Sequence, residues 1–164
     1  AKGNSPMIRI IIISVFILIQ SCSQVELIPS TSEQIMSKIK SYSSQKAVLL
    51  NIWALWCVPC VEEFPMIVDL DEEYDELEII FVSADFHEQK SEVKKFLKKQ
   101  GLDSISFIKN EKDDPFISGI HPEWTGSLPF TVVYSKNSGI IVDSWEGKHS
   151  ESRFRDAIDI AIKS

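Results

Sequence analysis

The sequence predicts an α/β fold in which helices cover both faces of one mixed β-sheet. Two near-continuous apolar runs, residues 47–53 and 77–83, have the composition of strands that are buried on both faces. Stretches with apolar residues at helical spacing alternate with such runs along the chain. The length of 164 residues, with 44% hydrophobic and 25% charged residues, suits one globular domain and excludes a disordered or collagen-like chain.

The first half of the predicted fold begins with residues 23–29, which form either a short strand or a tether. Ser30-Thr-Ser-Glu33 fits a capping box and predicts a helix directly after it. The strand over 47–53 is followed by a predicted helix from Cys57 to about Tyr74, which Pro65 should kink. The apolar residues expected to be buried in these two helices are Ile35, Met36, Ile39, Phe64, Ile67, Val68 and Leu70.

The second half begins with the strand over 77–83. Val93, Phe96 and Leu97 stand at helical spacing and predict a helix over 91–100 that ends at Gly101. Two β-prone runs joined by a polar turn predict an antiparallel hairpin. The remaining expected elements are a short strand over 105–108, the hairpin strands over 130–134 and 140–145, and an amphipathic helix from about Ser150, in which Glu151 and Arg155 should pair.

Residues 7–21 are predicted to be an export signal. Arg9 supplies a positive charge, and the apolar run over 10–19 is only ten residues long, whereas a bilayer span needs about 20. Residues 1–6 precede a plausible initiator, Met7, and are interpreted as an upstream extension or an expression scar.

Cys22 stands where the apolar run ends. Ile19-Gln20-Ser21-Cys22 resembles a bacterial lipobox, in which the cysteine is lipidated after cleavage. Gln20 departs from the usual residue, and the alternative is an ordinary signal peptide with an incidental cysteine. Lipidation would make residues 22–29 a tether and place a domain over 30–164 on the periplasmic or exterior side of a membrane.

Trp56-Cys57-Val58-Pro59-Cys60 directly follows a predicted strand and opens a predicted helix. The spacing brings both sulfurs into the first helical turn, where they can form a disulfide. The free N–H groups and the dipole at a helix N-terminus stabilise a thiolate, so Cys57 is the expected nucleophile and Cys60 the resolving thiol. Trp56, Val58 and Pro59 are expected to contact the substrate.

No metal or cofactor is expected. His87, His121 and His149 lack the spacing of zinc ligands, and a second CxxC is absent. The acidic run over 69–78 lacks the glycine of a calcium loop and is interpreted as a solvated helix end and turn. A purely structural disulfide is disfavoured because so small a loop gains little from cross-linking. A net charge of -7, without a basic stripe flanked by aromatic residues, argues against a nucleic-acid partner.

The segment from Trp53 to Pro65, Trp-Ala-Leu-Trp-Cys-Val-Pro-Cys-Val-Glu-Glu-Phe-Pro, resembles the active site of TlpA/ResA-like proteins of the thioredoxin fold. The resemblance covers about residues 30–163 and implies a thioredoxin-like fold with the extra strand–helix segment of this group around 81–97. It also implies an exported, membrane-tethered thiol-disulfide oxidoreductase. Trp124-Thr-Gly-Ser-Leu-Pro129 resembles the cis-proline loop of the group, and Gly147 matches a glycine before the last helix. By resemblance, Pro129 is cis and lies against the disulfide, and the Leu128 backbone pairs with the substrate chain.

The resemblance also draws attention to two polar positions. Thioredoxins carry a buried Asp six residues before the first cysteine, where this sequence has Asn51, which cannot accept a proton. ResA-like members have instead a Glu three residues after the second cysteine, which corresponds to Glu63. A desolvated carboxylate one turn from Cys60 could accept the proton of its thiol. The alternative is that Glu63 is solvated, like its neighbour Glu62.

The other aromatic and imidazole side chains are expected to be structural. Trp53 and Trp145 should pack in the core, and Trp124 should anchor the cis-proline loop. His121 is interpreted as a satisfied or solvated histidine rather than a catalytic one.

The leading functional hypothesis is reduction of disulfides in exported proteins by a monomer that receives electrons from a membrane dithiol donor. An oxidase or isomerase is the second interpretation, although Val58-Pro59 adds no charge between the cysteines. A peroxidase is disfavoured because no peroxidatic cysteine stands apart from the CxxC pair. A copper-handling protein of the same fold is a third interpretation, although the cysteine spacing and the histidine of such proteins are missing here.

Overall fold

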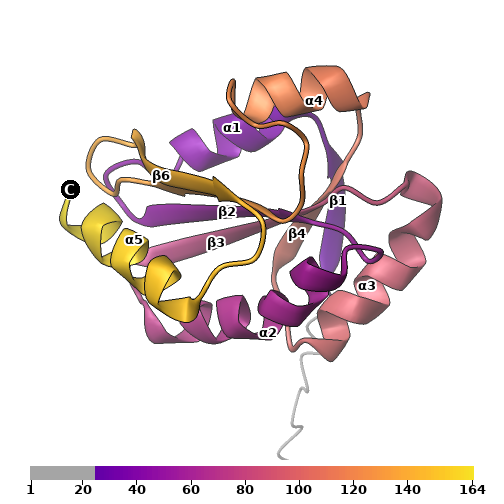
Figure 1. The fold of residues 1–164 in the computed structure, drawn as a ribbon, viewed down its shortest axis with the longest axis horizontal. Helices are drawn as coiled ribbons and strands as arrows, with labels where there is room; N and C mark the ends of the chain where they lie inside the picture. Colours follow the sequence, from indigo (N-terminus) through magenta and orange to yellow (C-terminus); the bar gives the residue numbers. More distant parts are fainter. Residues whose placement is uncertain (1–24) are drawn as a thin grey trace, which may run out of the picture.

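The computed structural model describes residues 25–164, which form a six-stranded mixed sheet between two layers of helices (Figure 1). The four strands at the β1 side of the sheet run parallel, and the last two pair antiparallel. The predicted mixed sheet, including the C-terminal hairpin, is therefore confirmed. In spatial order the strands are β1 (Glu26–Ser30), β4 (Ile105–Lys109), β3 (Leu77–Ser83), β2 (Ala47–Trp53), β5 (Phe130–Tyr134) and β6 (Ile141–Glu146).

The helices lie on both faces of the sheet, as predicted. One face is covered by α1 (Ser32–Lys40) and α4 (Asp113–Ile120), and the other by α2 (Val58–Glu73), α3 (Lys90–Lys99) and α5 (Glu151–Lys163) (Figure 1). All seven residues of β2 are buried, and their side chains alternate between two apolar cores. Leu49 and Trp53 face α2, whereas Leu50 and Ile52 face α1. Of the helix residues expected to be buried, Met36 and Val68 are half-buried and the others are fully buried.

The sheet begins before the predicted domain boundary at residue 30. Glu26–Ser30 pairs in parallel with β4, so a strand forms here rather than a tether, and residues 26–29 belong to the domain. Ser30 is the last residue of β1 and pairs with Lys109 of β4, and the N-cap of α1 is therefore Thr31. Its hydroxyl accepts the N–H of Gln34 at 3.3 Å, and the Gln34 side chain accepts the N–H of Thr31 at 2.9 Å. The predicted capping box thus lies one residue later in the chain.

Helix α4 is missing from the predicted order of elements. It has only eight residues and contains Pro115 and Gly119, both of which weaken a helical pattern. Pro115 stands in the first turn, where its missing N–H costs no intrahelical bond. A Cβ added at Gly119 would collide with the side chain of Ser32 on α1. The glycine thus permits a close approach of two helices that local sequence patterns do not reveal.

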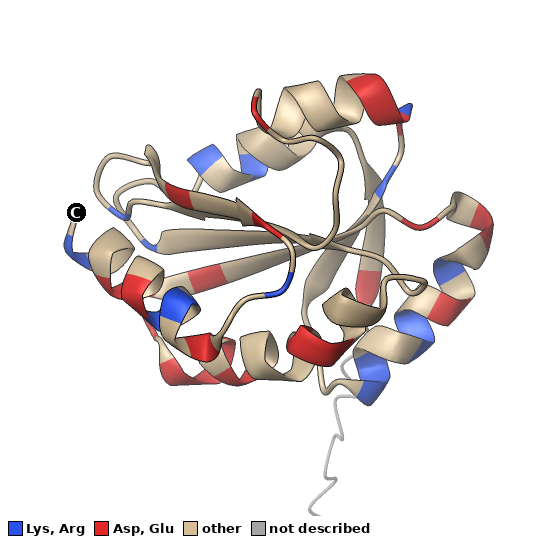
Figure 2. Cartoon of the chain, viewed as in Figure 1, with Lys and Arg blue, Asp and Glu red and all other residues tan. Residues whose placement is uncertain are grey.

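Charge is unevenly distributed over the helices. Figure 2 shows basic residues gathered on α3, whose sequence holds five lysines, and acidic residues along α2, whereas α5 carries both signs. Arg155 on α5 donates to Glu73 on α2 at 2.7 Å and pairs with Glu151 at 2.7 Å, as predicted for the latter. The Arg155–Glu73 pair joins α5 to the end of α2, on the face of the sheet that also carries the cysteine pair.

The predicted signal peptide over 7–21, the extension over 1–6 and the lipidation site Cys22 lie outside the described residues. Within residues 25–164, no helix is both long enough and apolar enough to cross a membrane.

Candidate active site

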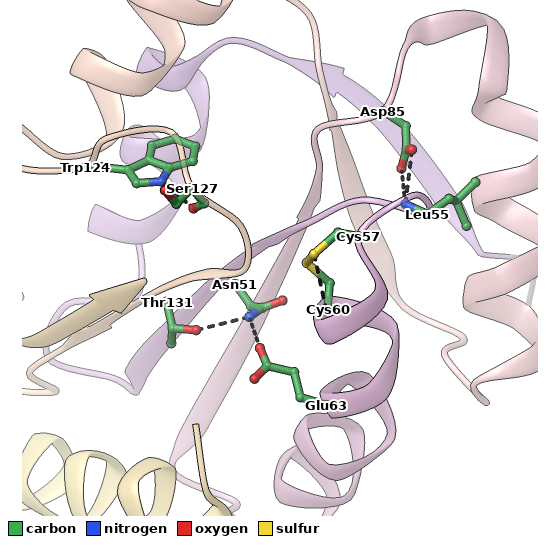
Figure 3. Close-up of a disulfide and its surroundings, with 9 residues drawn as sticks. All are labelled: Asn51, Leu55, Cys57, Cys60, Glu63, Asp85, Trp124, Ser127 and Thr131. Carbon is green, nitrogen blue, oxygen red and sulfur yellow. Dashed lines mark hydrogen bonds between the residues drawn. A yellow bond between two sulfur atoms is a disulfide. The ribbon is translucent and has the colours of Figure 1, made fainter. Parts of the chain in front are cut away.

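Cys57 and Cys60 form a disulfide at the N-terminus of α2 (Figure 3), with sulfurs 2.02 Å apart and Cα atoms 5.3 Å apart. Cys57 is the N-cap of the helix, and its Sγ accepts the backbone N–H of Cys60 at 3.3 Å. Pro59 stands in the first turn, where no hydrogen bond is lost. The position expected for the pair, directly after β2 and opening a helix, is confirmed. Pro65 lies inside α2 without ending it.

The surface beside the disulfide is apolar and exposed. Cys57 is 5% exposed and Cys60 is 1% exposed, so Cys57 is the more accessible of the two cysteines. Trp56 and Val58, on either side of Cys57, are 63% and 66% exposed, and Pro59 is also exposed. Exposed apolar side chains gathered at one place are typical of a contact surface for another chain.

In the reduced protein, Cys57 is expected to react with iodoacetamide at neutral pH in large excess over Cys60. The Cys60 N–H points at the Cys57 sulfur and favours its thiolate, whereas Cys60 lies one turn deeper in the protein. Both cysteines fall in one tryptic peptide, so fragment-ion mass spectrometry after brief alkylation distinguishes them. Modification of Cys60 first would overturn this assignment.

Glu63 is buried between α2 and the sheet, with 2% of its surface exposed. Its side chain points from α2 towards Asn51 on β2 (Figure 3), whose amide donates to Glu63 Oε1 at 3.5 Å and to Thr131 Oγ1 at 3.1 Å. Glu63 Oε2 has no hydrogen-bond partner within residues 25–164. The alternative of a solvated Glu63 is therefore wrong. Its neighbour Glu62 is the solvated one and pairs with Lys148 at 2.6 Å.

Burial raises the pKa of the Glu63 carboxyl to about 7, from an ordinary value of 4.5. The backbone amide of His149, the side chain of Asn51 and the charge of Lys148 oppose this effect without cancelling it. Because Asn51 is neutral, it donates to the carboxylate but cannot exchange a proton with it. Glu63 is thus a group within the described site that can gain or lose a proton near neutral pH.

The loop before β5 faces the active-site motif. The Leu128–Pro129 peptide bond is cis, as the resemblance implies. Trp124 anchors the loop because its Nε1 donates to Ser127 O at 2.9 Å and its ring stacks on Phe130, and Gly147 N–H donates to Pro129 O at 2.8 Å. Trp56 and Leu128 line the same cavity. The backbone of Leu128 makes no hydrogen bond to another described residue, which leaves it able to pair with a bound chain.

Asp85 is a residue of the site that the sequence patterns did not single out. It is 1% exposed, and both carboxylate oxygens accept the N–H of Leu55, at 3.1 and 3.0 Å (Figure 3). The Ser83 hydroxyl also donates to Asp85, at 2.8 Å. This carboxylate ties the loop before Cys57 to the end of β3. An acid at the carboxyl end of a buried strand, beside the strand that leads into CxxC, was the available signal.

The other aromatic and imidazole residues that are expected to be structural are buried. Trp53 is fully buried in an aromatic cluster with Phe64 and Phe96, and Trp145 is buried against Phe154. His121 is buried, and its Nδ1 accepts the N–H of Glu123 at 3.2 Å. Across residues 25–164, no group of three or more His, Cys, Asp or Glu side chains could hold a metal ion.

Residues 25–145 match the model of the AhpC/TSA family. The chain belongs to the AhpC/TSA family. Its curated relatives include the thiol-disulfide oxidoreductase ResA of Bacillus subtilis (strain 168), 25% identical over 115 residues, which cover 70% of this chain and 61% of ResA. The thioredoxin-like protein YneN of the same organism is 30% identical over 120 residues, which cover 70% of this chain and 65% of YneN. The chain therefore spans less than two thirds of the length of these two relatives.

Two solved structures are similar in fold to this AhpC/TSA family member. A DsbF homologue from Corynebacterium diphtheriae is 22% identical, with a TM-score of 0.60 over 74% of this chain and 75% of that one. A thiol:disulfide interchange protein of the thioredoxin family from Chlorobium tepidum TLS is also 22% identical, with a TM-score of 0.60 over 74% of this chain and 83% of that one. The predicted thioredoxin-like fold and the resemblance to ResA-like proteins are thereby confirmed.

Proposed function

We propose that this protein is a thiol-disulfide oxidoreductase that reduces disulfides of exported proteins. The observation that carries the proposal is the Cys57–Cys60 pair at the N-terminus of α2, in which Cys57 is the more accessible cysteine and lies beside an exposed apolar surface. The similarity to a thiol-disulfide oxidoreductase and to a thioredoxin-like protein supports it. The buried Glu63 adds a carboxyl group whose pKa is raised to about 7.

The proposed reaction begins with the reduced pair. The Cys57 thiolate attacks one sulfur of the substrate disulfide, which breaks, and the other substrate sulfur leaves as a thiolate. The Cys60 thiolate then attacks the Cys57 sulfur, the Cys57–Cys60 bond forms and the second substrate thiolate leaves. Two electrons thus pass from the protein to the substrate, and a membrane dithiol donor would restore the reduced pair. No cofactor takes part in this cycle.

Glu63 is proposed to accept the proton of the Cys60 thiol during the second step. It lies one helical turn after Cys60 and can exist in either protonation state at neutral pH. The free backbone of Leu128 is proposed to pair with the substrate chain and to hold its sulfur against Cys57. Trp56, Val58 and Pro59 would supply the apolar contact surface.

Dithiothreitol-driven reduction of insulin tests this function. The wild-type protein is expected to accelerate insulin reduction at catalytic concentration, and Cys57→Ser should abolish the acceleration because the attacking thiolate is lost. Glu62→Gln, which changes an exposed carboxylate on the same helix, is the control that should keep activity. Equal acceleration by Cys57→Ser and the wild type would contradict the proposal.

We propose that the domain is tethered to a membrane through a lipid on Cys22. The apolar run over 10–19 is too short to span a bilayer, so it would not by itself anchor the protein in the membrane. Cys22→Ser, expressed in a bacterial host, is therefore expected to shift the protein from the membrane fraction to the soluble exported fraction. Immunoblotting of the fractions measures this, and a Cys22→Ser protein that still sediments with membranes would rule out lipidation as the tether.

A further inference from the structure

A cavity of about 220 Å³ lies beside the disulfide, between the active-site loop, the segment after β3, and α4. Four aromatic side chains line it, namely Trp56, Phe86, Phe116 and Trp124, and Leu128 of the cis-proline loop completes it on one side. Phe86 is 71% exposed and Trp56 is 63% exposed, so the mouth of the cavity presents two large apolar side chains to solvent. Two exposed aromatic residues at one opening call for a binding partner rather than a packing role.

We propose that this cavity binds a large apolar side chain, preferably aromatic, of the substrate polypeptide, located two residues from the cysteine that reacts with Cys57. The proposal rests on the function proposed above and names the chemical class of its substrate. It assigns a binding role to Phe86 and to α4, an element that local sequence patterns did not reveal.

The charges of the cavity favour an uncharged occupant. The only charged side chains that line it are Lys109 and Asp113, and these two form an ion pair with each other at i,i+4. Neither is therefore left to bind a charged group of a ligand. The other lining residues are aromatic or aliphatic, apart from Gly126.

The size of the cavity favours a side chain over an independent small molecule. A volume of about 220 Å³ is below the roughly 300–1,000 Å³ of pockets that enclose a drug-sized ligand. One aromatic ring is of a size that such a cavity can take, against a wall that includes Trp124 and Phe116. These two rings are held edge to face, with centroids 6.0 Å apart.

The site is held in place by the buried carboxylate described above. Asp85 fixes the backbone of Leu55, the residue before Trp56, and is itself the residue before Phe86. One carboxylate thus positions both exposed aromatic walls of the cavity. A pre-positioned site loses less conformational entropy when the substrate binds.

The position of the cavity sets the spacing of the side chain from the reacting cysteine. Trp56 is adjacent to Cys57, and Leu128, whose backbone is free to pair with a bound chain, lines the cavity. A chain that pairs with Leu128 is extended, and in an extended chain side chains two residues apart point to the same face. When the substrate cysteine points at Cys57, the substrate side chain two residues away therefore points at the same face of the protein, on which the cavity opens.

The test uses reduced protein and peptides of the form X-Gly-Cys-Gly-X, in which the cysteine carries thionitrobenzoate as a chromogenic leaving group. X is Phe, Ser or Lys, and hydroxyethyl disulfide, which has no side chain to bind, reports the chemistry of Cys57 alone. The Phe peptide is expected to react about tenfold faster than the Ser peptide, since burying one large apolar side chain supports a difference of that size. The Lys peptide should show no advantage over the Ser peptide.

The matched variants are Phe86→Ser and Ile140→Ser, which each remove one exposed apolar side chain, 71% and 66% exposed respectively. Phe86→Ser is expected to lose most of the preference for Phe, Ile140→Ser should keep it, and all three proteins should reduce hydroxyethyl disulfide at the same rate. A wild-type protein without preference, or a preference that survives in Phe86→Ser, would overturn the proposal.

The two proposals can fail separately. If the wild type reduces no disulfide at all, the proposed function fails. The cavity is then tested by the binding of the same peptides with serine in place of cysteine. This binding is measured through the change in intrinsic tryptophan fluorescence. Weaker binding of the Phe peptide to Phe86→Ser than to Ile140→Ser would still support the cavity as an apolar site, and equal binding would refute it.

Discussion

The Cys60→Ser variant is expected to accumulate its substrates as mixed disulfides on Cys57. Attack by Cys57 forms a covalent intermediate, and only a nearby second thiolate releases it quickly. Cys60 is that thiol, since its Cα lies 5.3 Å from that of Cys57 in the oxidised pair. Release without it depends on thiols from solution. The trapped complexes should be visible by non-reducing electrophoresis after acid quenching and should disappear with dithiothreitol.

Two controls define what the trapping experiment shows. Cys57→Ser should form no complexes, because the attacking sulfur is missing, and the double variant should behave in the same way. Cys60 alone is not expected to substitute for Cys57, because only 1% of its surface is exposed in the folded protein. Complexes of equal yield in Cys57→Ser would show that the order of the two thiols assigned here is wrong.

The Glu63→Gln variant is expected to slow release of the mixed disulfide by about 100-fold at pH 7, within the usual range for loss of a general base. Glutamine keeps the size and the hydrogen-bonding capacity towards Asn51 but cannot accept a proton. The defect should shrink as pH rises above the ordinary thiol pKa of about 8.5, because Cys60 then ionises without help. Stopped-flow measurement of the second step against pH provides the test.

The same substitution should also change the pH dependence of stability. The pKa of Glu63 is raised to about 7 in the folded protein, so the folded state binds more protons than the unfolded state between pH 4.5 and 7. Stability is therefore lost as pH rises through this window, by on the order of 3 kcal/mol in total. Glu63→Gln removes this loss. The oxidised variant should be more stable than the wild type at pH 8, and the advantage should decline towards pH 4.5.

Glu62→Gln is the matched control for both measurements. Glu62 is the preceding residue on the same helix, but it is exposed and pairs with Lys148 in solvent. Its substitution should leave the second step and the pH dependence of stability close to those of the wild type. If Glu62→Gln reproduced the effects of Glu63→Gln, the general loss of negative charge from α2 would explain them, and burial of Glu63 would not.

Much of the fold follows from short-range patterns in the sequence. The apolar runs over β2 and β3 are buried on both faces of the sheet. The CxxC motif follows the carboxyl end of β2 and begins α2. The features that the sequence patterns missed or left open depend on contacts distant in sequence. Helix α4 needs Gly119 to approach Ser32, and the strand character of Glu26–Ser30 depends on pairing with β4.

The candidate site divides in the same way. The cysteines and the cis bond before Pro129 are tied to local motifs, so the sequence and its resemblance were enough to predict them. The burial of Glu63 was open, because Glu62 and Glu63 differ only in the side of α2 on which they lie. Asp85 and Phe86 escaped attention because their roles depend on the loop of Leu55 and Trp56, some 30 residues away in the chain.

The reduction potential of the Cys57–Cys60 pair tests the central proposal most directly. The protein is equilibrated in dithiothreitol redox buffers, and the fraction of free thiols is measured by mass spectrometry after alkylation. A reductant of exported proteins should show one reversible two-electron transition with a midpoint near the roughly -270 mV of thioredoxin. A midpoint near the roughly -120 mV of a strong disulfide-forming oxidant, or no reversible transition at all, would contradict the account.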